Sequence, residues 1–163
     1  MRVLGIDPGL RELGYAILEE GVNLLKANTI YTSSSVGRPE RLRIIYQILD
    51  EEVELYKPEL LCVERVFFHR NAKSAMEIGE VRGVVLLLCA QRGMRVLEIS
   101  PLELKRALTN WGKASKKDIA EVLRRFFGLS LSTSHEYDAA ALALCGFTAI
   151  KRNLYLDDRV SQR

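Results

Sequence analysis

Two short apolar runs of this chain each end in a single carboxylate. Val3–Ile6 leads into Asp7, and Leu60–Val63 leads into Glu64. A short apolar run bounded by turn signals is typical of a buried strand. Pro8-Gly9 follows Asp7 as a turn, because proline presets one backbone dihedral and glycine adopts positive φ freely. The pattern predicts two central strands that deliver carboxylates to one edge of a sheet.

The rest of the chain alternates strand and helix patterns. Apolar runs at 13–19 and 22–31 follow the first strand (2–7) at short intervals, which favours an antiparallel meander. Strand patterns recur at 59–64 and 96–99, and helical patterns begin at Pro39 and near residues 72, 101, 115 and 134. Two of these helices start with capping boxes, Ser100-Pro-Leu-Glu103 and Ser115-Lys-Lys-Asp118. We therefore predict an α/β fold, a five-stranded mixed sheet with helices on both faces.

Length and composition fit a single globular domain. With 163 residues, 48% hydrophobic and 28% charged, the chain can bury a sizeable core. We expect one domain over residues 1–151 and a polar, frayed tail over 152–163. The apolar runs near 84–90 and 139–147 are too short to span a membrane, and no signal peptide begins the chain, so a cytoplasmic location is expected. Three cysteines lie in apolar runs without metal-ligand spacing and are expected to be reduced core thiols: Cys62, Cys89 and Cys145.

Positive charge is concentrated in the middle of the chain. Residues 65–125 carry thirteen Lys/Arg and six Asp/Glu, a net charge of +7 in a chain whose total is +3. Such a stretch suggests a polyanionic partner. Solvated helix faces would give the same composition.

A third acidic cluster, His135-Glu-Tyr-Asp138, opens the last helix. If Asp7, Glu64 and Asp138 meet, their charges raise one another's pKa, and a divalent cation relieves that conflict. Mg²⁺ prefers oxygen ligands, and two ions about 4 Å apart can activate water and stabilise a leaving oxygen in phosphodiester cleavage. His135 would share a helix face with Asp138, as a metal ligand or a proton carrier. Alternatively, the residues have no common role: Asp7 caps a turn, Glu64 is a surface residue, and His135 and Asp138 are polar residues at the start of a helix.

Two further features allow two interpretations each. Phe67-Phe68 follows Glu64 closely and is either core or a base-stacking wedge beside Arg70. Gly79 and Gly83 lie inside a helix, where each costs about 1 kcal/mol relative to alanine. That cost indicates close approach of another backbone, from the sheet or from a second subunit.

Taken together, the motifs resemble the RuvC family of Holliday-junction resolvases. The resemblance spans residues 1–150 and is carried by Gly5-Ile-Asp-Pro-Gly9, Glu64-Arg-Val-Phe-Phe68, Asn71-Ala-Lys-Ser-Ala75, Arg82-Gly83 and His135-Glu-Tyr-Asp-Ala-Ala140. It implies a ribonuclease H-like fold and a homodimer that nicks four-way DNA junctions symmetrically in recombination and repair. It also implies Mg²⁺ as the cofactor, two ions per site, with Mn²⁺ as a substitute.

The resemblance assigns roles to single residues. The family's four catalytic, metal-binding positions fall on Asp7, Glu64, His135 and Asp138. Many members have Asp at position 135, so His135 is either a ligand or a proton carrier, with Glu136 as a partial substitute. The expected DNA contacts are Phe67, Phe68, Arg70, Lys73, Lys105, Lys113, Lys116 and Lys117. The helix with Gly79 and Gly83 matches the dimer helix, and a branch-migration motor complex is an implied partner.

Three alternatives belong to other classes. ATP-binding folds of the actin and sugar-kinase type use a Gly-x-Asp-x-Gly turn like Gly5-Ile-Asp-Pro-Gly9, but they need two lobes, and this chain has room for one. A catalytically inactive nucleic-acid binding module would not need the full set of acids. A related nuclease that acts on RNA would need the same set, and only substrate tests separate it from a junction nuclease.

Overall fold

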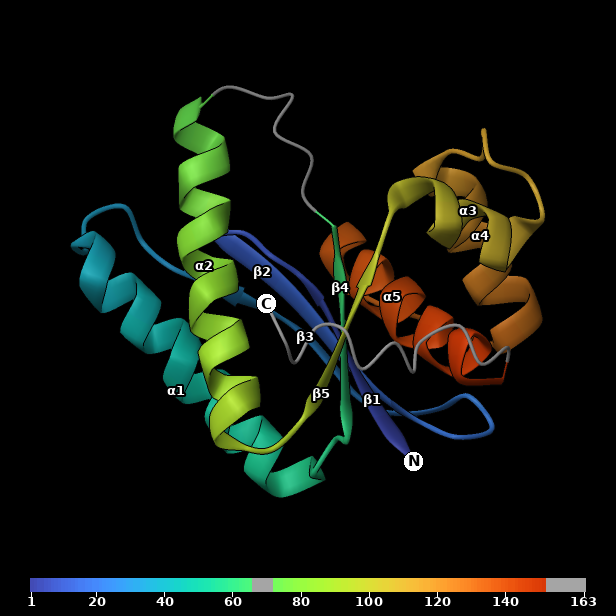
Figure 1. The fold of residues 1–163 in the computed structure, drawn as a ribbon. Helices are drawn as coiled ribbons and strands as arrows, with labels where there is room; N and C mark the ends of the chain where they lie inside the picture. The colour runs from blue at the N-terminus through green and yellow to red at the C-terminus, as the bar shows by residue number, and fades with distance from the viewer. Residues whose placement is uncertain (66–71, 152–163) are drawn as a thin grey trace, which may run out of the picture.

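Five strands form one mixed sheet, as predicted, and their order in the sheet is β3-β2-β1-β4-β5 (Figure 1). The computed structural model describes residues 1–65 and 72–151. The strands are β1 (Arg2–Asp7), β2 (Glu12–Glu19), β3 (Asn23–Tyr31), β4 (Leu60–Glu64) and β5 (Arg95–Ile99). The helices are α1 (Arg38–Tyr56), α2 (Ala72–Gln91), α3 (Pro101–Thr109), α4 (Lys116–Phe127) and α5 (Ser134–Lys151).

Strand register decides where the acids emerge. β1 pairs antiparallel with β2, so that Asp7 lies opposite Gly14. β1 also pairs parallel with β4, and the last paired residues are Ile6 and Val63. Asp7 and Glu64 follow directly, and both therefore leave the sheet at the same edge. This confirms the placement expected from the two apolar runs.

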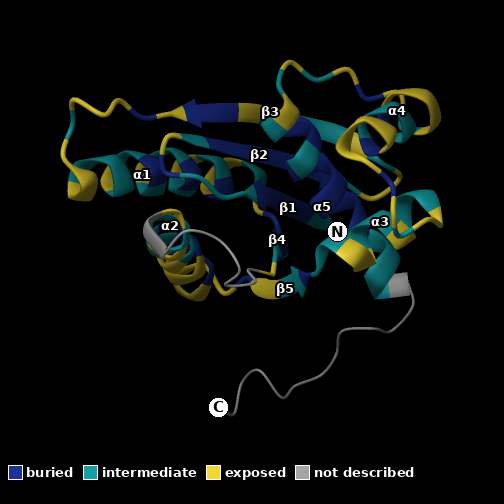
Figure 2. Cartoon of the chain, turned by 90° about the horizontal axis from the view of Figure 1, so that it is seen from above, coloured by how far each residue is buried: buried dark blue, intermediate teal, exposed yellow. Residues whose placement is uncertain are grey.

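The sheet separates two hydrophobic cores (Figure 2). Side chains alternate between the faces of a strand. Val3 and Cys62 accordingly belong to the core under α5, with α3 and α4 beyond it. Leu4 and Leu61 belong to the opposite core, which α1 and α2 cover.

Helix α5 lies unusually close to the sheet. A Cβ added to Gly5 would stand 1.9 Å from the Ala139 carbonyl oxygen, and one added to Gly14 would stand 2.2 Å from the His135 carbonyl oxygen. Such distances are far below van der Waals contact, so only glycine fits at either position. Residue His135 is thus placed against β2 by backbone packing and not by a flexible loop.

Local signals explain where the later helices begin. Both predicted capping boxes form: Ser100 and Ser115 accept from the third backbone N–H of α3 and α4, and Glu103 and Asp118 accept the Ser100 and Ser115 N–H groups. These hydrogen bonds satisfy donors that a helix start leaves unpaired.

The three cysteines are free and buried, as expected. Burial, followed by the charge of Glu103, raises the pKa of Cys145 to about 12, which keeps its thiol protonated. Within the described residues, no helix is both long and apolar enough to span a membrane.

Candidate active site

The imidazole of His135 is clamped between two carboxylates at the acidic edge of the sheet. Its Nδ1 lies 2.8 Å from Asp7 Oδ2, and its Nε2 lies 2.9 Å from Glu12 Oε2. The hydrogen bond to Asp7, reinforced by Glu12 and opposed by partial burial, raises the pKa of His135 above 6.5. Each carboxylate can accept a hydrogen from one ring nitrogen, so the clamp favours the imidazolium form.

Asp7 is a largely buried carboxylate whose pKa is raised above its ordinary value. Burial is the largest effect and raises its pKa, and the nearby charge of Asp138 adds to this. The hydrogen bond to His135 and the charge of Lys116 act in the opposite direction. The influence of Asp138 indicates that acids from β1 and α5 are close enough to repel.

A lysine from α4 points into this acidic cluster. Lys116 Nζ donates to Asp138 Oδ2. Burial lowers the pKa of Lys116, but the hydrogen bond to Asp138 and the charges of Asp138, Asp7 and Glu64 raise it overall. Three carboxylates, from β1, β4 and α5, therefore act on one ammonium group.

An arginine of α2 holds the end of β4 through hydrogen bonds. Arg82 Nη1 donates to the Glu64 carbonyl oxygen at 2.7 Å, and its Nη2 pairs with Glu98 on β5. This bridge holds the backbone that carries Glu64.

The donor set fits a hard cation by chemistry, although it is not arranged as a finished metal site. Among residues 1–65 and 72–151, no three His, Cys, Asp or Glu side chains are grouped as ligands. Lys116 and His135 instead neutralise the acids. Carboxylate oxygens are the ligands that Mg²⁺ prefers, and the charges of Asp138, Asp7 and Glu64 all raise the pKa of Lys116, as acids near one cation do.

Comparison with known proteins places this arrangement in a family. The family model described as crossover junction endodeoxyribonuclease RuvC matches residues 3–146. The chain belongs to the RuvC family. A relative of the same description from Caldicellulosiruptor saccharolyticus is 37% identical over 98% of this chain and 100% of its own length.

Solved RuvC structures share the fold. Thermus thermophilus RuvC is 31% identical with a TM-score of 0.85, covering 94% of this chain and 97% of that one. Thermus thermophilus RuvC in complex with a Holliday junction substrate is also 31% identical, with a TM-score of 0.87 over 94% and 96% of the two chains. The ribonuclease H-like fold expected from the resemblance is confirmed.

This RuvC-family chain brings together the four residues expected to be catalytic, at one end of β1, β4 and α5. One associated expectation is wrong. Glu136 does not substitute for His135, since it is buried and faces β3. Its Oε1 accepts from Thr29 and its Oε2 accepts from the Ser132 N–H at 2.9 Å.

Glu12 is the functional candidate that the sequence did not reveal. It stands at the start of β2, where a single carboxylate carries no local signal. Its partner His135 is separated by 123 positions, and only the docking of α5 on β2 brings the two together.

The other expected residues lie in different places. Lys105 is on α3, and Lys113 and Lys117 are exposed near the start of α4. Phe67, Phe68 and Arg70 lie outside the described residues. The same is true of the Lys73 side chain and of the tail at 152–163. Gly79 and Gly83 are exposed with open space around them, so the sheet is not the backbone that approaches them.

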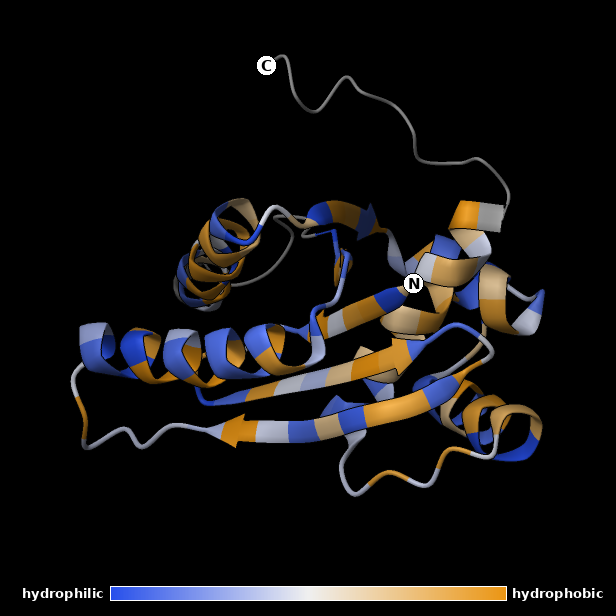
Figure 3. Cartoon of the chain, turned by 90° about the horizontal axis from the view of Figure 1, so that it is seen from below, coloured by the Kyte–Doolittle hydropathy of each residue, from blue (hydrophilic) through white to orange (hydrophobic). Residues whose placement is uncertain are grey.

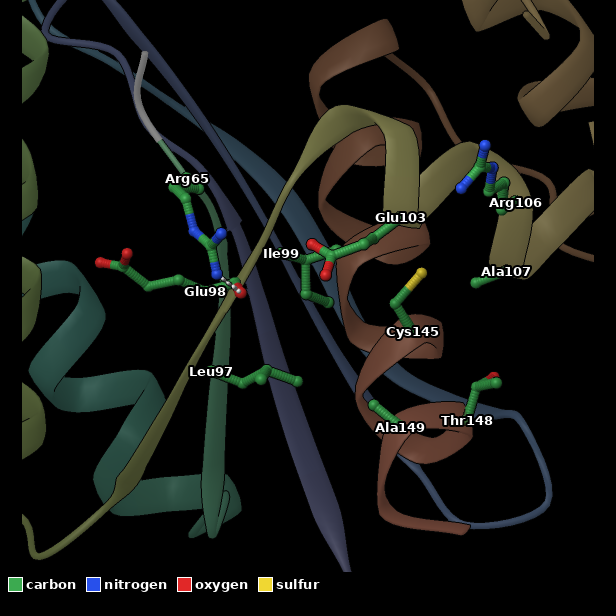
Figure 4. Close-up of a pocket in the computed structure, with 10 residues that line it drawn as sticks. All are labelled: Arg65, Leu97, Glu98, Ile99, Glu103, Arg106, Ala107, Cys145, Thr148 and Ala149. Atoms are coloured by element: carbon green, nitrogen blue, oxygen red, sulfur yellow. Dashed lines mark hydrogen bonds between the residues drawn. The ribbon is translucent and has the colours of Figure 1, made fainter. Parts of the chain in front are cut away.

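A separate pocket of about 330 Å³ lies between β5, α3 and α5, away from these acids (Figure 4). Leu97, Ile99 and Cys145 are among the residues that line it, and Arg65, which also lines it, donates to the Glu98 carbonyl oxygen. It contains none of the four expected catalytic residues.

Proposed function

We propose that this chain is a Mg²⁺-dependent endonuclease that resolves four-way DNA junctions by paired symmetric nicks in homologous recombination and repair. The observation that carries the proposal is the placement of Asp7, Glu64 and Asp138 at one end of β1, β4 and α5, where Lys116 contacts Asp138 and the charges of all three acids raise its pKa. The relatives described as crossover junction endodeoxyribonucleases and the RuvC complex with a Holliday junction substrate support the choice of DNA junction.

Asp7, Glu64 and Asp138 would hold the metal, proposed as two Mg²⁺ ions with Mn²⁺ able to replace them. Bound Mg²⁺ supplies an activated water and stabilises the leaving oxygen. His135 keeps a proton on Nε2, which faces Glu12. Its protonated ring also places a positive charge beside Asp7. Lys116 brings a positive charge to the position where a scissile phosphate must approach the acids.

The direct test is cleavage of a synthetic four-way junction with Mg²⁺ and with EDTA. Asp138→Asn should abolish cleavage, by about 100-fold or more, because a neutral amide is a poor metal ligand, while junction binding in EDTA persists. Asp50→Asn is the matched control, since Asp50 pairs with Arg92 on the far surface of α1 and α2. An Asp138→Asn protein that cuts at near the wild-type rate would refute the assignment.

A homodimer is part of the proposal, because one site cuts one strand and resolution needs two symmetric cuts. Figure 3 shows hydrophobic residues on more than one side of α2, where a surface helix usually has one apolar stripe. Met76 and Leu87 are 61% and 55% exposed, and the exposed Gly79 and Gly83 lie between them. We name this set the α2 stripe; it would let two α2 helices approach closely.

RNA cleavage and junction binding without catalysis are the alternative functions. Parallel assays on a junction and on an RNA–DNA hybrid separate them from the proposed one. A branch-migration motor complex is proposed as a partner from the resemblance, and the cytoplasm as the location, where bacterial chromosomal DNA lies.

A further inference from the structure

Trp111 is the single tryptophan of the chain, and its side chain is 57% exposed. It lies in the loop between α3 and α4, five residues before Lys116. Leu102 of α3, 46% exposed, lies beside the same loop, since a Cβ added to Gly112 would stand 2.7 Å from Leu102 Cδ1. Isolated exposed apolar side chains are common and need no explanation, so what matters is how this indole is held and what surrounds it.

The backbone around Trp111 is fixed by hydrogen bonds. The Asn110 N–H donates to the Arg106 carbonyl at 3.0 Å, and the Trp111 N–H donates to Thr109 Oγ1 at 3.1 Å. The Trp111 carbonyl accepts from the Ala114 N–H at 3.2 Å, and Ala114 is fully buried. The indole is therefore presented outward by an anchored loop.

The surroundings of the indole are basic. Lys105, Arg106, Lys113 and Lys117 come from the same loop and the helices that flank it, and none of the four forms an ion pair with a residue in the described ranges. The nearby acids Glu103 and Asp118 are occupied in the capping boxes. The loop that carries the indole and the helix ends beside it thus hold four cations that form no ion pair within residues 1–65 and 72–151.

This combination distinguishes between kinds of partner. An apolar protein surface would cover Trp111 but would desolvate the neighbouring cations without pairing them, which is costly. A nucleic acid strand offers both features, a flat base or sugar face for the indole and phosphates for the cations. The surface is also continuous with the candidate active site, through Lys116 and its contact with Asp138.

We propose that Trp111 stacks on a base or deoxyribose of the junction strand that runs past the active site, while Lys105, Arg106 and Lys113 neutralise its phosphates. This inference rests on the proposed junction-binding function. It adds a second aromatic contact, on a different element from the Phe67-Phe68 pair.

The wild-type protein contains its own probe, because all tryptophan emission comes from Trp111. The protein is titrated in EDTA with a four-way junction that carries a fluorescein on one arm. Fluorescein anisotropy reports binding, and Trp111 emission reports the contact. We expect the emission to be quenched along the same isotherm, and acrylamide to quench it less in the complex than in the free protein.

Trp111→Leu should weaken junction binding by about 5- to 150-fold, the range that loss of one stacking contact gives. Trp111→Phe should restore most of the affinity, because a phenyl ring still stacks. Phe126→Leu is the matched control, an exposed aromatic (78%) at the other end of α4, and should leave affinity unchanged.

Emission that stays unchanged at saturating anisotropy, or a Trp111→Leu protein with wild-type affinity, would overturn the inference and leave the proposed function standing. Absence of any anisotropy change with wild-type protein would instead refute junction binding itself.

Discussion

At the scale of single residues, the clamp on His135 is the feature with most chemical content. Two carboxylates, Asp7 and Glu12, accept from its two ring nitrogens. In a histidine with only one acidic partner, the ring nitrogen that faces water can lose its proton while the hydrogen bond to the acid remains. Here the loss of either proton breaks a contact, so the charged form is favoured.

We predict that Glu12→Gln lowers the pKa of His135 toward 6.5, because it removes one of the groups that raise it. The folded pKa lies above the ordinary value. The stabilisation from Glu12 is therefore fully present below about pH 6.5 and disappears as the pH rises through the folded pKa. NMR titration of the His135 ring in EDTA measures the shift directly.

Urea unfolding gives an independent check of the sign. The difference in free energy of unfolding between wild type and Glu12→Gln should be larger at about pH 6 than at about pH 9. An identical His135 pKa in the two proteins would mean that the Glu12 contact carries no electrostatic weight.

At the scale of elements, α5 against the β1–β2 hairpin is the contact that builds the site. Gly14 lies under the first turn of α5, where an added Cβ would meet the His135 carbonyl at 2.2 Å. A side chain at this position must push the start of α5 away from the sheet. That start carries both His135 and Asp138.

Gly14→Ala should therefore reduce the free energy of unfolding by about 1–3 kcal/mol, as overpacking does, and reduce junction cleavage further than the folded fraction accounts for. Chemical denaturation and a cleavage assay on the same sample measure the two effects. Gly37→Ala is the matched control, because its nearest neighbour would be Pro39 Cδ at 3.9 Å. Equal behaviour of the two variants would contradict the packing argument.

Elements with local signals were predictable, and contacts between distant segments were not. Pro39 and the two capping boxes fixed the starts of α1, α3 and α4 to within a residue or so, since they act within four positions. The shared edge of Asp7 and Glu64 followed from parallel strands. Glu12 was missed and Glu136 was misjudged for one physical reason: the rotation of α5 on the sheet decides which side chains face the acids, and no local pattern encodes it.

At the scale of the whole molecule, the α2 stripe leaves the isolated chain with apolar surface on the side of α2 that the sheet does not cover. Gly83 has no atom within 4 Å of an added Cβ, so a larger side chain fits the single chain without strain. We predict that Gly83→Leu gives a normally folded protein that is largely monomeric and poorly active. Sedimentation velocity, thermal unfolding and the cleavage assay separate the three properties.

A matched pair of substitutions controls for general surface effects. Leu87→Glu on α2 should prevent dimerisation, whereas Leu55→Glu on α1, where leucine is 69% exposed, should not. A wild-type protein that sediments as a monomer at micromolar concentration with junction bound would contradict the dimer.

The clamp on His135 joins residues 128 and 123 positions apart, near the two ends of the described chain. A nascent polypeptide therefore lacks these contacts of the candidate active site until α5 has been synthesised and has docked on the first hairpin. Contacts of such sequence separation form late and slowly in folding. Under the proposed function, a chain synthesised only as far as α4 lacks both His135 and Asp138, so the topology keeps it from cutting DNA before α5 is in place.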